Sequence, residues 1–219
     1  EKLLVQENEI KELKKILMQG NVLGANITVP YKEKIIEIVD KIDKETKESK
    51  ASNTIYKSGE NIRATNTDGK GFITSIKRDF NLELENSNVF IIGAGGAAKG
   101  IAISLCKAKV GKITILNRNE QRAKRLRFMC KNFKTKINLQ KWEDKKIPKA
   151  TDLVVNCTSI GMKANEKLEL DFSVVKKGIF IYDIVYKKGK TFLLRRSTKL
   201  GHRTSDGLSM LIRQAAESF

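Results

Sequence analysis

The chain has 219 residues and a mass of 24.7 kDa, which is enough for two modest domains or for one large domain. Hydrophobic residues make up 40% of it, and 15 glycines with only 2 prolines are too few for a low-complexity sequence, so a packed core is expected. No apolar run approaches the roughly 20 residues that a membrane-spanning helix requires, which argues against an integral membrane protein.

The 43 basic and 25 acidic residues leave a net charge of +18. Such a balance is typical of nucleic-acid-binding proteins, but 33 of the basic residues are lysines, only 10 are arginines, and they are spread along the whole chain. A surface that reads bases would be richer in arginine. We therefore expect no nucleic-acid partner, while the positive field would favour an anionic cofactor.

Three cysteines and a single histidine, His202, are too few and too far apart for a structural zinc site or a disulfide framework. The cysteines are Cys106, Cys130 and Cys157. We expect no metal, no membrane attachment and a reducing, cytoplasmic setting.

The first 80 residues predict a mixture of short helices and strands. A helix is expected from about Glu9, and Pro30 should end a strand over residues 26–29 because proline lacks a backbone donor. Apolar residues at helical spacing predict a helix over residues 31–48. Two strands, 53–56 and 62–66, flank a Ser58-Gly59 turn, and a helix is expected from Gly69 to Phe80.

From about residue 85 the pattern changes to strands that alternate with helices. A continuous apolar run at 89–92 is typical of a buried parallel strand. The elements expected after it are a helix over 98–108, a strand over 112–116, a helix over 120–132, strands over 151–157 and 179–185, and a last amphipathic helix over 206–219. This alternation predicts a doubly wound α/β domain.

A glycine-rich turn, G-x-G-x-x-A, joins the strand at 89–92 to the next helix. In it Gly93 allows a tight turn, Gly95 lets the backbone approach a pyrophosphate, and the small Ala98 lets helix and strand pack closely. Free N–H groups and the helix dipole would then attract the phosphates. The motif favours dinucleotide binding over a turn that merely connects two elements.

The end of the next strand indicates which dinucleotide. NAD-binding proteins carry Asp or Glu there, whereas this chain reads Asn117-Arg118-Asn119, with Arg122 one turn later. Two guanidinium groups suit the 2′-phosphate of NADP(H), because a planar fork can pair with it through two hydrogen bonds. The alternative is two surface arginines, which is disfavoured because cations at a helix N-terminus oppose the dipole.

The N-terminal part supplies candidates for the chemistry. Asn26 and Thr28 would share one face of a strand, with Lys32 just beyond it, and Asp68 lies at the end of another strand. An ammonium held by a carboxylate could donate a proton as a hydride reduces a carbonyl. Spacing alone leaves two ordinary alternatives open, since most lysines are solvated and Asn-Thr-Asp-Gly is a good turn sequence.

Taken together, these motifs resemble the shikimate dehydrogenase family. The matching blocks run in the family's order from residue 24 to residue 216: GANITVPYK at 24–32, ASNT at 51–54, NTDGKGF at 66–72, GAGGA at 93–97, Asn117-Arg118, NCTSIGM at 156–162, and DGLSML at 206–211 with Gln214. Each block alone is weak, but their combination in this order is highly specific. The chain departs from the family pattern at Lys50, Ser52 and Asn119.

The resemblance implies NADPH-dependent, reversible reduction of 3-dehydroshikimate to shikimate, a step in chorismate and aromatic amino-acid biosynthesis. It gives Lys32 the role of general acid/base and Asp68 that of its partner. The residues implied to bind substrate are Thr28, Asn53, Asp68, Tyr186 and Gln214. Those implied to bind NADP(H) are Gly93, Ala94, Gly95, Gly96, Ala97, Asn117, Arg118, Asn119 and Arg122, with Ile184 and Gly207 at the nicotinamide end.

The resemblance also implies two α/β domains with the active site in the cleft between them. The substrate-binding domain is expected to comprise residues 1–84 and 206–219, and the Rossmann-like NADP-binding domain residues 85–205. The family usually opens with a strand and a Ser-x-Ser loop that binds the substrate carboxylate, and Glu1 already falls after them, so we expect a fragment. Three alternatives remain open: a quinate/shikimate dehydrogenase, a catalytically impaired NADP-binding fragment, and a basic nucleic-acid binder. We expect a monomer or a homodimer.

Overall fold

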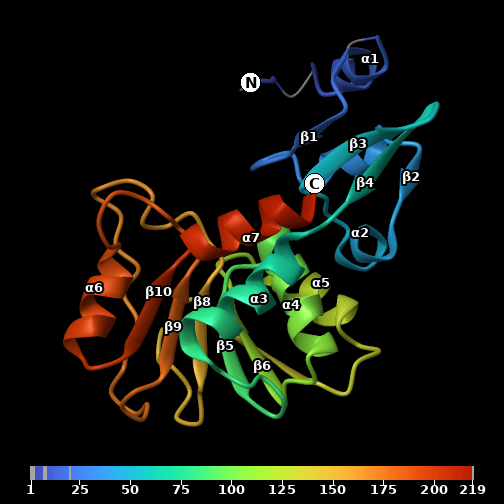
Figure 1. Ribbon diagram of the computed structural model, residues 1–219. Helices are drawn as coiled ribbons and strands as arrows, with labels where there is room; N and C mark the ends of the chain where they lie inside the picture. The colour runs from blue at the N-terminus through green and yellow to red at the C-terminus, as the bar shows by residue number, and fades with distance from the viewer. Residues whose placement is uncertain (1–2, 7–8, 20, 219) are drawn as a thin grey trace.

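Two sheets of different size organise the chain. The structure, a computed structural model, describes residues 3–6, 9–19 and 21–218, so the parts of the expected segments at residues 1–2, 7–8, 20 and 219 lie outside it. The small sheet has the strand order β1-β3-β4-β2 and the large one the order β10-β9-β8-β5-β6-β7 (Figure 1). The large sheet is entirely parallel. The predicted α/β class, with a Rossmann-like parallel sheet, is confirmed.

The small sheet is built around a hairpin of β3 (Thr54–Ser58) and β4 (Asn61–Thr65). On one edge β1 (Gly24–Asn26) pairs antiparallel with β3, and on the other β2 (Lys41–Ile42) pairs parallel with β4. One face is apolar and packs against α1 (Glu12–Gln19). The shared core buries Leu13, Leu17, Ile35, Ile55 and Ile62.

Two predictions for this region are wrong. The strand expected at 26–29 is β1, which ends at Asn26, because Tyr31 N–H donates to the Thr28 carbonyl and closes a turn. The helix expected over 31–48 is broken into a 3-10 turn, η2 (Lys34–Glu37), the strand β2 and the helix α2 (Lys44–Ser49). Its middle forms sheet hydrogen bonds instead: Asp40 N–H donates to the Ile62 carbonyl and Asp43 N–H to the Ala64 carbonyl.

In the large sheet β5 (Asn88–Ile92) is central. The chain continues outward on one side to β6 (Lys112–Leu116) and β7 (Lys136–Gln140), then crosses to β8 (Leu153–Asn156), β9 (Phe180–Asp183) and β10 (Arg203–Asp206) on the other. The order therefore reverses between β5 and β8. Ligands of open α/β sheets bind at such a switch point, outside the carboxyl ends of the strands.

Three elements of the large sheet were not predicted: β7, β10 and the helix α6 (Phe192–Lys199). The two strands lie at the edges of the sheet and carry polar residues, so the continuous apolar run that marks a central strand is missing. Because β10 ends at Asp206, the last helix, α7 (Leu208–Ser218), begins two residues later than predicted. The helix α5 (Glu120–Met129) ends three residues earlier than predicted.

Three helices lie where the two sheets meet: α3 (Asp68–Phe80), α4 (Gly96–Lys107) and α7. In Figure 1, α7 runs from the large sheet toward the small one. The helix α3 packs against both α7 and α4. The contacts are close because glycine lies at them: a Cβ on Gly69 would come 2.6 Å from the Gly100 carbonyl oxygen. Phe72 and Ile76 of α3 and Met210 of α7 belong to the core of the large sheet.

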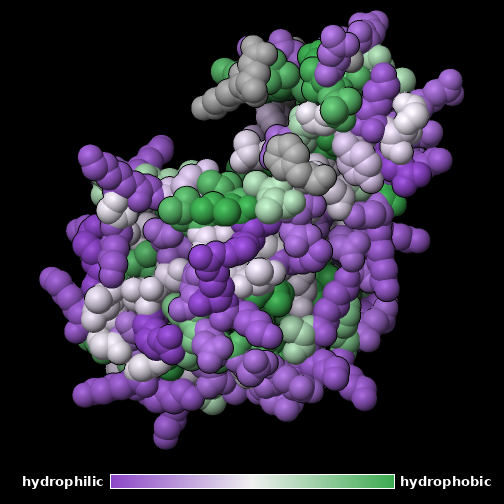
Figure 2. Space-filling model, viewed as in Figure 1, coloured by the Kyte–Doolittle hydropathy of each residue, from purple (hydrophilic) through white to green (hydrophobic). Residues whose placement is uncertain are grey.

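The surface is hydrophilic over most of the face seen in Figure 2, and apolar residues gather over α7. Leu208 and Ile212 of this helix are exposed. Among the helices of the described ranges, none combines the length and the apolar character needed to cross a bilayer.

His202 makes the stability of the fold depend on pH. Its side chain is 8% exposed and stacks on Phe172, and burial lowers its pKa. Below about pH 6.5 the unfolded chain therefore binds a proton that the folded chain does not. As the pH is lowered, the free energy of unfolding decreases by at most about 1.4 kcal/mol per pH unit. We expect His202→Gln to reduce this slope between about pH 7 and about pH 5.5, in urea titrations. If the free energy of unfolding depends equally on pH in His202→Gln and in the wild type, then His202 is not the source of this pH dependence.

Candidate active site

A lysine and an aspartate from distant parts of the chain form an ion pair where the two sheets meet. Lys32 Nζ lies 2.6 Å from Asp68 Oδ2, and the two side chains are only 15% and 4% exposed. Lys32 lies in the turn after β1, where its carbonyl accepts a hydrogen bond from Ser52 N–H, and Asp68 is the first residue of α3. In a site so shielded from water, a charge-assisted hydrogen bond fixes the ammonium in one position.

Two amide side chains extend this pair. Asn53 Nδ2 lies 3.2 Å from Asp68 Oδ1 and 2.6 Å from Gln214 Oε1, and Asn53 Oδ1 accepts a hydrogen bond from Thr67 N–H. Asn53 comes from the segment before β3 and Gln214 from α7. The structure thus brings together four of the predicted residues from four separate segments, with donors and acceptors that a polyol ring would need.

Asn66 and Thr67 hold Asp68 in place, although the sequence patterns gave neither of them a role. The Asn66 side-chain oxygen Oδ1 accepts a hydrogen bond from Asp68 N–H, and its Nδ2 donates to the Ala51 carbonyl at 2.8 Å. Thr67 Oγ1 donates to the Gln214 carbonyl. These hydrogen bonds join buried or partly buried groups and hold the turn that presents the Asp68 carboxylate. The sequence could have indicated this role, because both residues belong to the Asn-Thr-Asp-Gly motif that contains Asp68.

The glycine loop, residues 93–97, follows β5 at the switch point. Gly93 has φ +108°, which favours glycine, and a Cβ on it would lie 3.1 Å from the Cys157 carbonyl after β8. Gly95 is the N-cap residue of α4 and offers no side chain to the free N–H groups of the first turn, which begins with Gly96 and Ala97. A Cβ on Gly95 would meet nothing within 4 Å. The loop therefore has both the free donors and the open space that a pyrophosphate requires.

The same loop reaches the ion pair. A Cβ on Gly96 would lie 3.1 Å from Lys32 Cβ, and one on Gly100, a turn further along α4, would lie 3.5 Å from Asp68 Cβ. Ala94 and Ala98 are buried behind the loop, which keeps it close to the sheet. The Lys32–Asp68 ion pair is thus in direct contact with the glycine loop and with the helix that follows it.

Gly95→Ala tests the predicted role of Gly95 in binding a pyrophosphate. Its φ of −86° is open to alanine and its Cβ direction is empty, so we expect the melting temperature to stay unchanged. The added methyl group would occupy the space of the pyrophosphate, so the affinity for NADPH should fall by about tenfold or more. Fluorescence titration with NADPH and thermal denaturation measure the two effects.

Gly69→Ala is the matched control for Gly95→Ala. Its Cβ would press on backbone and side-chain atoms of α4, so overpacking should cost about 1–3 kcal/mol of stability. If Gly95→Ala loses as much stability as Gly69→Ala, or binds NADPH with unchanged affinity, then the glycine loop does not bind the pyrophosphate as predicted.

The segment after β6 is arranged by its own hydrogen bonds. Asn119 Oδ1 caps α5 by accepting from Arg122 N–H, and Asn117 Nδ2 donates to the Asn119 carbonyl. Arg118 and Arg122 are exposed, and within the described part of the chain neither has a carboxylate partner. Two unpaired guanidinium groups at the start of a helix suit a phosphate, whereas the side chain of Asn119 already serves as the helix cap.

The predicted nicotinamide end lies where β9 meets the start of α7. Gly207 packs so closely on the Ile184 carbonyl that a Cβ would overlap it. Behind Ile184, the buried Asp183 accepts hydrogen bonds from Asn156 Nδ2 and Thr191 Oγ1, which the sequence patterns did not indicate. Burial raises the pKa of Asp183 despite these hydrogen bonds. This network ties the ends of β8 and β9 to α6, and so fixes the backbone that carries Ile184.

Thr28 and Tyr186 are the two predicted residues that the structure leaves apart. Both are exposed, Tyr186 by half, and no hydrogen bond within the described ranges joins either one to the Lys32–Asp68 network. Their assignment to a substrate stays a prediction.

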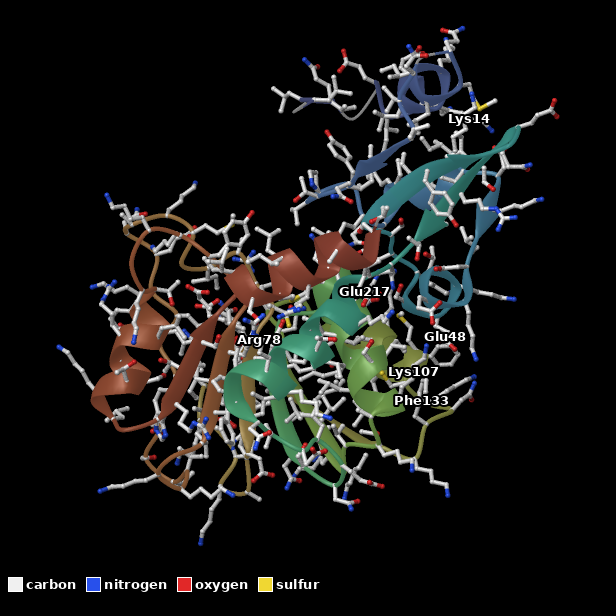
Figure 3. The ribbon with its side chains drawn as sticks, viewed as in Figure 1. Lys14, Glu48, Arg78, Lys107, Phe133 and Glu217 are labelled. Carbon is white, nitrogen blue, oxygen red and sulfur yellow. The ribbon has the colours of Figure 1, made fainter. Side chains whose placement is uncertain are left out.

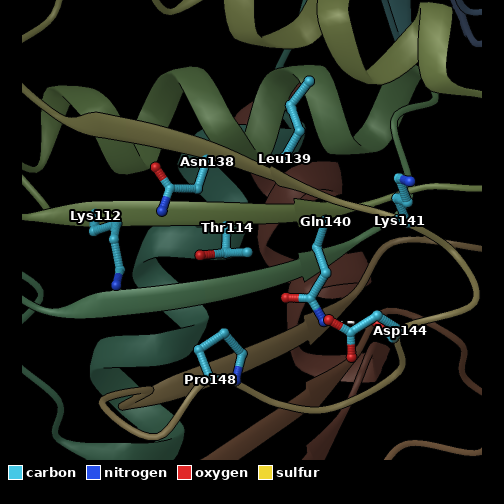
Figure 4. A pocket seen from close by; sticks show the side chains of 8 residues that line it. All are labelled: Lys112, Thr114, Asn138, Leu139, Gln140, Lys141, Asp144 and Pro148. Atoms are coloured by element: carbon cyan, nitrogen blue, oxygen red, sulfur yellow. Dashed lines mark hydrogen bonds between the residues drawn. The ribbon is translucent and has the colours of Figure 1, made fainter.

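Two cavities lie near the large sheet and do not contain Lys32. One of about 690 Å³ lies between α2, α3 and α4, behind the turn that carries Asp68. The other, of about 340 Å³, lies on the outer strands β6 and β7 and is lined by polar side chains such as Lys112, Asn138 and Gln140 (Figure 4). Neither is the surface on which the ion pair and the glycine loop meet.

The comparisons with known proteins agree with this geometry. The family model for the shikimate dehydrogenase substrate binding domain matches residues 1–55, and that for shikimate / quinate 5-dehydrogenase matches residues 74–185. The shikimate dehydrogenase (NADP(+)) of Caldicellulosiruptor saccharolyticus is 36% identical over 91% of this chain and 71% of its own length. That of Pelagibacter ubique is 34% identical over 100% of this chain and 80% of its own length.

Solved structures show the same fold. The shikimate dehydrogenase of Aquifex aeolicus has a TM-score of 0.87 with 30% identity, covering 98% of this chain and 77% of its own. The 5-ketofructose reductase of a Gluconobacter strain has a TM-score of 0.87 with 28% identity, over 99% of this chain and 78% of its own. The quinate dehydrogenase of Corynebacterium glutamicum, in complex with NAD, has a TM-score of 0.83 with 28% identity, over 95% and 75%. By sequence and by structure, this chain belongs to the shikimate dehydrogenase family.

Proposed function

We propose that this protein is an NADP-dependent oxidoreductase that reduces 3-dehydroshikimate reversibly to shikimate, as part of chorismate and aromatic amino-acid biosynthesis. The observation that carries the proposal is the shielded Lys32–Asp68 ion pair in contact with the glycine loop. In this proposal Lys32 is the proton donor and the glycine loop beside it binds the pyrophosphate of the dinucleotide. The curated relatives, which are named for this substrate and this cofactor, support it.

The chain's own residues supply the proton and the orientation of the substrate. Bound NADPH supplies the hydride that reduces the carbonyl carbon. Lys32 donates a proton from Nζ to the carbonyl oxygen, which becomes the new hydroxyl, and in the reverse direction it takes that proton back. Asp68 holds the ammonium in place through the 2.6 Å hydrogen bond and accepts from the hydroxyl groups of the ring.

Four other residues would select the ring. Asn53 and Gln214 already lie beside Asp68 and offer amide donors and acceptors to neighbouring hydroxyls. Thr28 and Tyr186, at the exposed margin, would complete the set. A site of this kind discriminates strongly against analogues that lack a hydroxyl, because its buried polar groups would be left unpaired.

The cofactor is NADP(H), and the residues that would hold it lie at the ends of β5, β6 and β9. Gly93 through Ala97 would hold the pyrophosphate, and Asn117, Arg118 and Arg122 the adenosine phosphate. Asn119 would act through its cap on α5. Ile184 and Gly207 would line the nicotinamide. No carboxylate stands where an NAD enzyme would bind the ribose, which favours NADP over NAD.

We place the substrate-binding domain at residues 1–84 and 206–219 and the cofactor domain at 85–205, with catalysis in the cleft between them. The protein would act on a small molecule, without nucleic acid or membrane, as a monomer or a homodimer. A cytoplasmic location fits the free, buried thiols of Cys106, Cys130 and Cys157.

Steady-state rates with shikimate and quinate, each with NADP⁺ and NAD⁺, test the function. We expect the highest kcat/KM for shikimate with NADP⁺. A preference for quinate or for NAD⁺ would reassign the protein to quinate or mixed quinate/shikimate oxidation. If none of the four pairs reacts while NADPH still binds, the protein is a cofactor-binding module without this activity.

A further inference from the structure

A second ion pair joins the cofactor helix to the residue next to Lys32. Lys99 Nζ lies 2.6 Å from Glu33 Oε2, and the Lys99 side chain is only 12% exposed. Glu33 follows Lys32 directly in the turn after β1, and Lys99 lies in the first turn of α4, which begins at Gly96. The two residues are 66 positions apart, so nothing local in the sequence signals the contact.

Lys99 is an unfavourable choice for its position unless Glu33 is its partner. The first turn of a helix is the positive end of the dipole, where a lysine is destabilising. Burial of its ammonium adds a desolvation cost, which a carboxylate at 2.6 Å offsets. The pairing directs the ammonium toward the small-sheet segment.

The ion pair lies on the face of α4 that contacts both catalytic residues. Gly96 packs on Lys32, and Gly100, four residues later, packs on Asp68. Lys99 lies three residues after Gly96, so it shares this face. The pair therefore links the two segments next to the contact between Gly96 and Lys32.

We infer that the Glu33–Lys99 ion pair positions Lys32 against the cofactor loop, and that Glu33 and Lys99 are positioning residues for proton transfer. This inference rests on the proposed function. Without the pair, one fixed link between the turn after β1 and α4 would be lost, and the backbone that carries Lys32 would be held less firmly against the glycine loop. Displacement of a reacting group by about 1 Å costs up to about 10²-fold in rate.

The other end of α4 provides a matched control. Lys107 Nζ lies 2.7 Å from Glu48 Oε2 and 3.5 Å from Glu45 Oε1, both on α2, and Figure 3 shows Glu48 and Lys107 side by side. Burial lowers the pKa of Lys107, but its two glutamate partners outweigh that effect and leave the pKa raised. This pair also joins α4 to the small-sheet part, yet it lies about three turns along α4 from Gly96, which packs on Lys32.

The test is kinetic and uses the native protein. We expect Glu33→Gln and Lys99→Gln each to lower kcat by about tenfold, with less than about threefold change in the dissociation constant of NADPH. Lys99→Arg keeps the cation and should recover most of the rate, and Lys107→Gln should leave kcat within about twofold of wild type. Unchanged kcat in Glu33→Gln, or equal losses in Lys107→Gln, would overturn the inference.

Two further measurements distinguish this positioning role from a direct role of Lys99 in cofactor binding. If Lys99→Gln weakens NADPH binding strongly while Glu33→Gln tightens it and keeps kcat, then Lys99 binds the cofactor phosphates and the inference fails.

A double-mutant cycle in chemical denaturation tests the pair without any assay of turnover: the double variant should lose less stability than the two single variants combined. An inactive wild type with a positive coupling would refute the proposed function alone, and a zero coupling would refute the pair.

Discussion

Lys32→Ala is expected to lower kcat for the reduction of 3-dehydroshikimate by about 10²–10⁴-fold, the range that a positioned general acid contributes. The variant removes the ammonium that lies 2.6 Å from Asp68 and leaves the forming alkoxide without a proton donor. The glycine loop lies nearest to the first carbon of the Lys32 side chain, which alanine keeps: a Cβ on Gly96 would lie 3.1 Å from Lys32 Cβ and 3.6 Å from Lys32 Cδ. The dissociation constant of NADPH should therefore change by less than about threefold. Steady-state kinetics and NADPH fluorescence titration give the two values.

The control for Lys32→Ala is Lys44→Ala, which removes an exposed lysine at the start of α2. It should leave both values unchanged, because most of the 33 lysines are solvated. A second control concerns folding: the thermal denaturation of Lys32→Ala should remain cooperative. A Lys32→Ala protein that folds and turns over at the wild-type rate would show that another group donates the proton.

The second large effect concerns the choice of cofactor. We expect Arg118→Ala combined with Arg122→Ala to weaken NADPH binding by about 10²-fold or more, since a hydrogen bond between charged groups contributes about 1.5–3 kcal/mol. NADH lacks the 2′-phosphate, so its affinity should change by less than about threefold. Both arginines are exposed and neither pairs with a carboxylate in the described part of the chain, so the fold should tolerate their loss.

Fluorescence titrations with NADPH and NADH, at two salt concentrations, measure this effect. Arg125→Ala, on an exposed face of the same helix α5, is the matched control for lost positive charge. Equal losses of affinity for NADPH and NADH in the double variant, or an equal loss in Arg125→Ala, would show that the arginines act through the general field of the protein and do not recognise the phosphate.

Some of this architecture could be predicted from the sequence because it depends on short-range patterns. The run at 89–92 is apolar on both faces, which marked β5 as a central parallel strand, and Gly93 and Gly95 follow it at the spacing that a phosphate-binding turn requires. The structure adds what spacing could not say, namely that the Gly95 Cβ direction is empty and that Gly96 touches Lys32.

Other features depend on contacts that a linear pattern does not contain. Ile35, Ile36, Val39 and Ile42 lie at helical spacing, yet residues 40–43 pair with β4, so tertiary hydrogen bonds prevailed over periodicity. The strands β7 and β10 lie at the edges of the sheet and lack the continuous apolar run that marks a central strand. The Lys32–Asp68 and Glu33–Lys99 pairs span 36 and 66 residues, and spacing alone suggested only the first of them as one of several alternatives.

A crystal structure of the complex with NADP⁺ and shikimate is the sharpest test of Lys32 as the proton donor. We expect Lys32 Nζ within hydrogen-bond distance, about 2.6–3.2 Å, of the shikimate hydroxyl whose carbon faces the nicotinamide, with Asp68 still bound to the ammonium. We also expect the pyrophosphate over Gly95. A shikimate bound elsewhere, or a Lys32 side chain turned away from that hydroxyl, would contradict it.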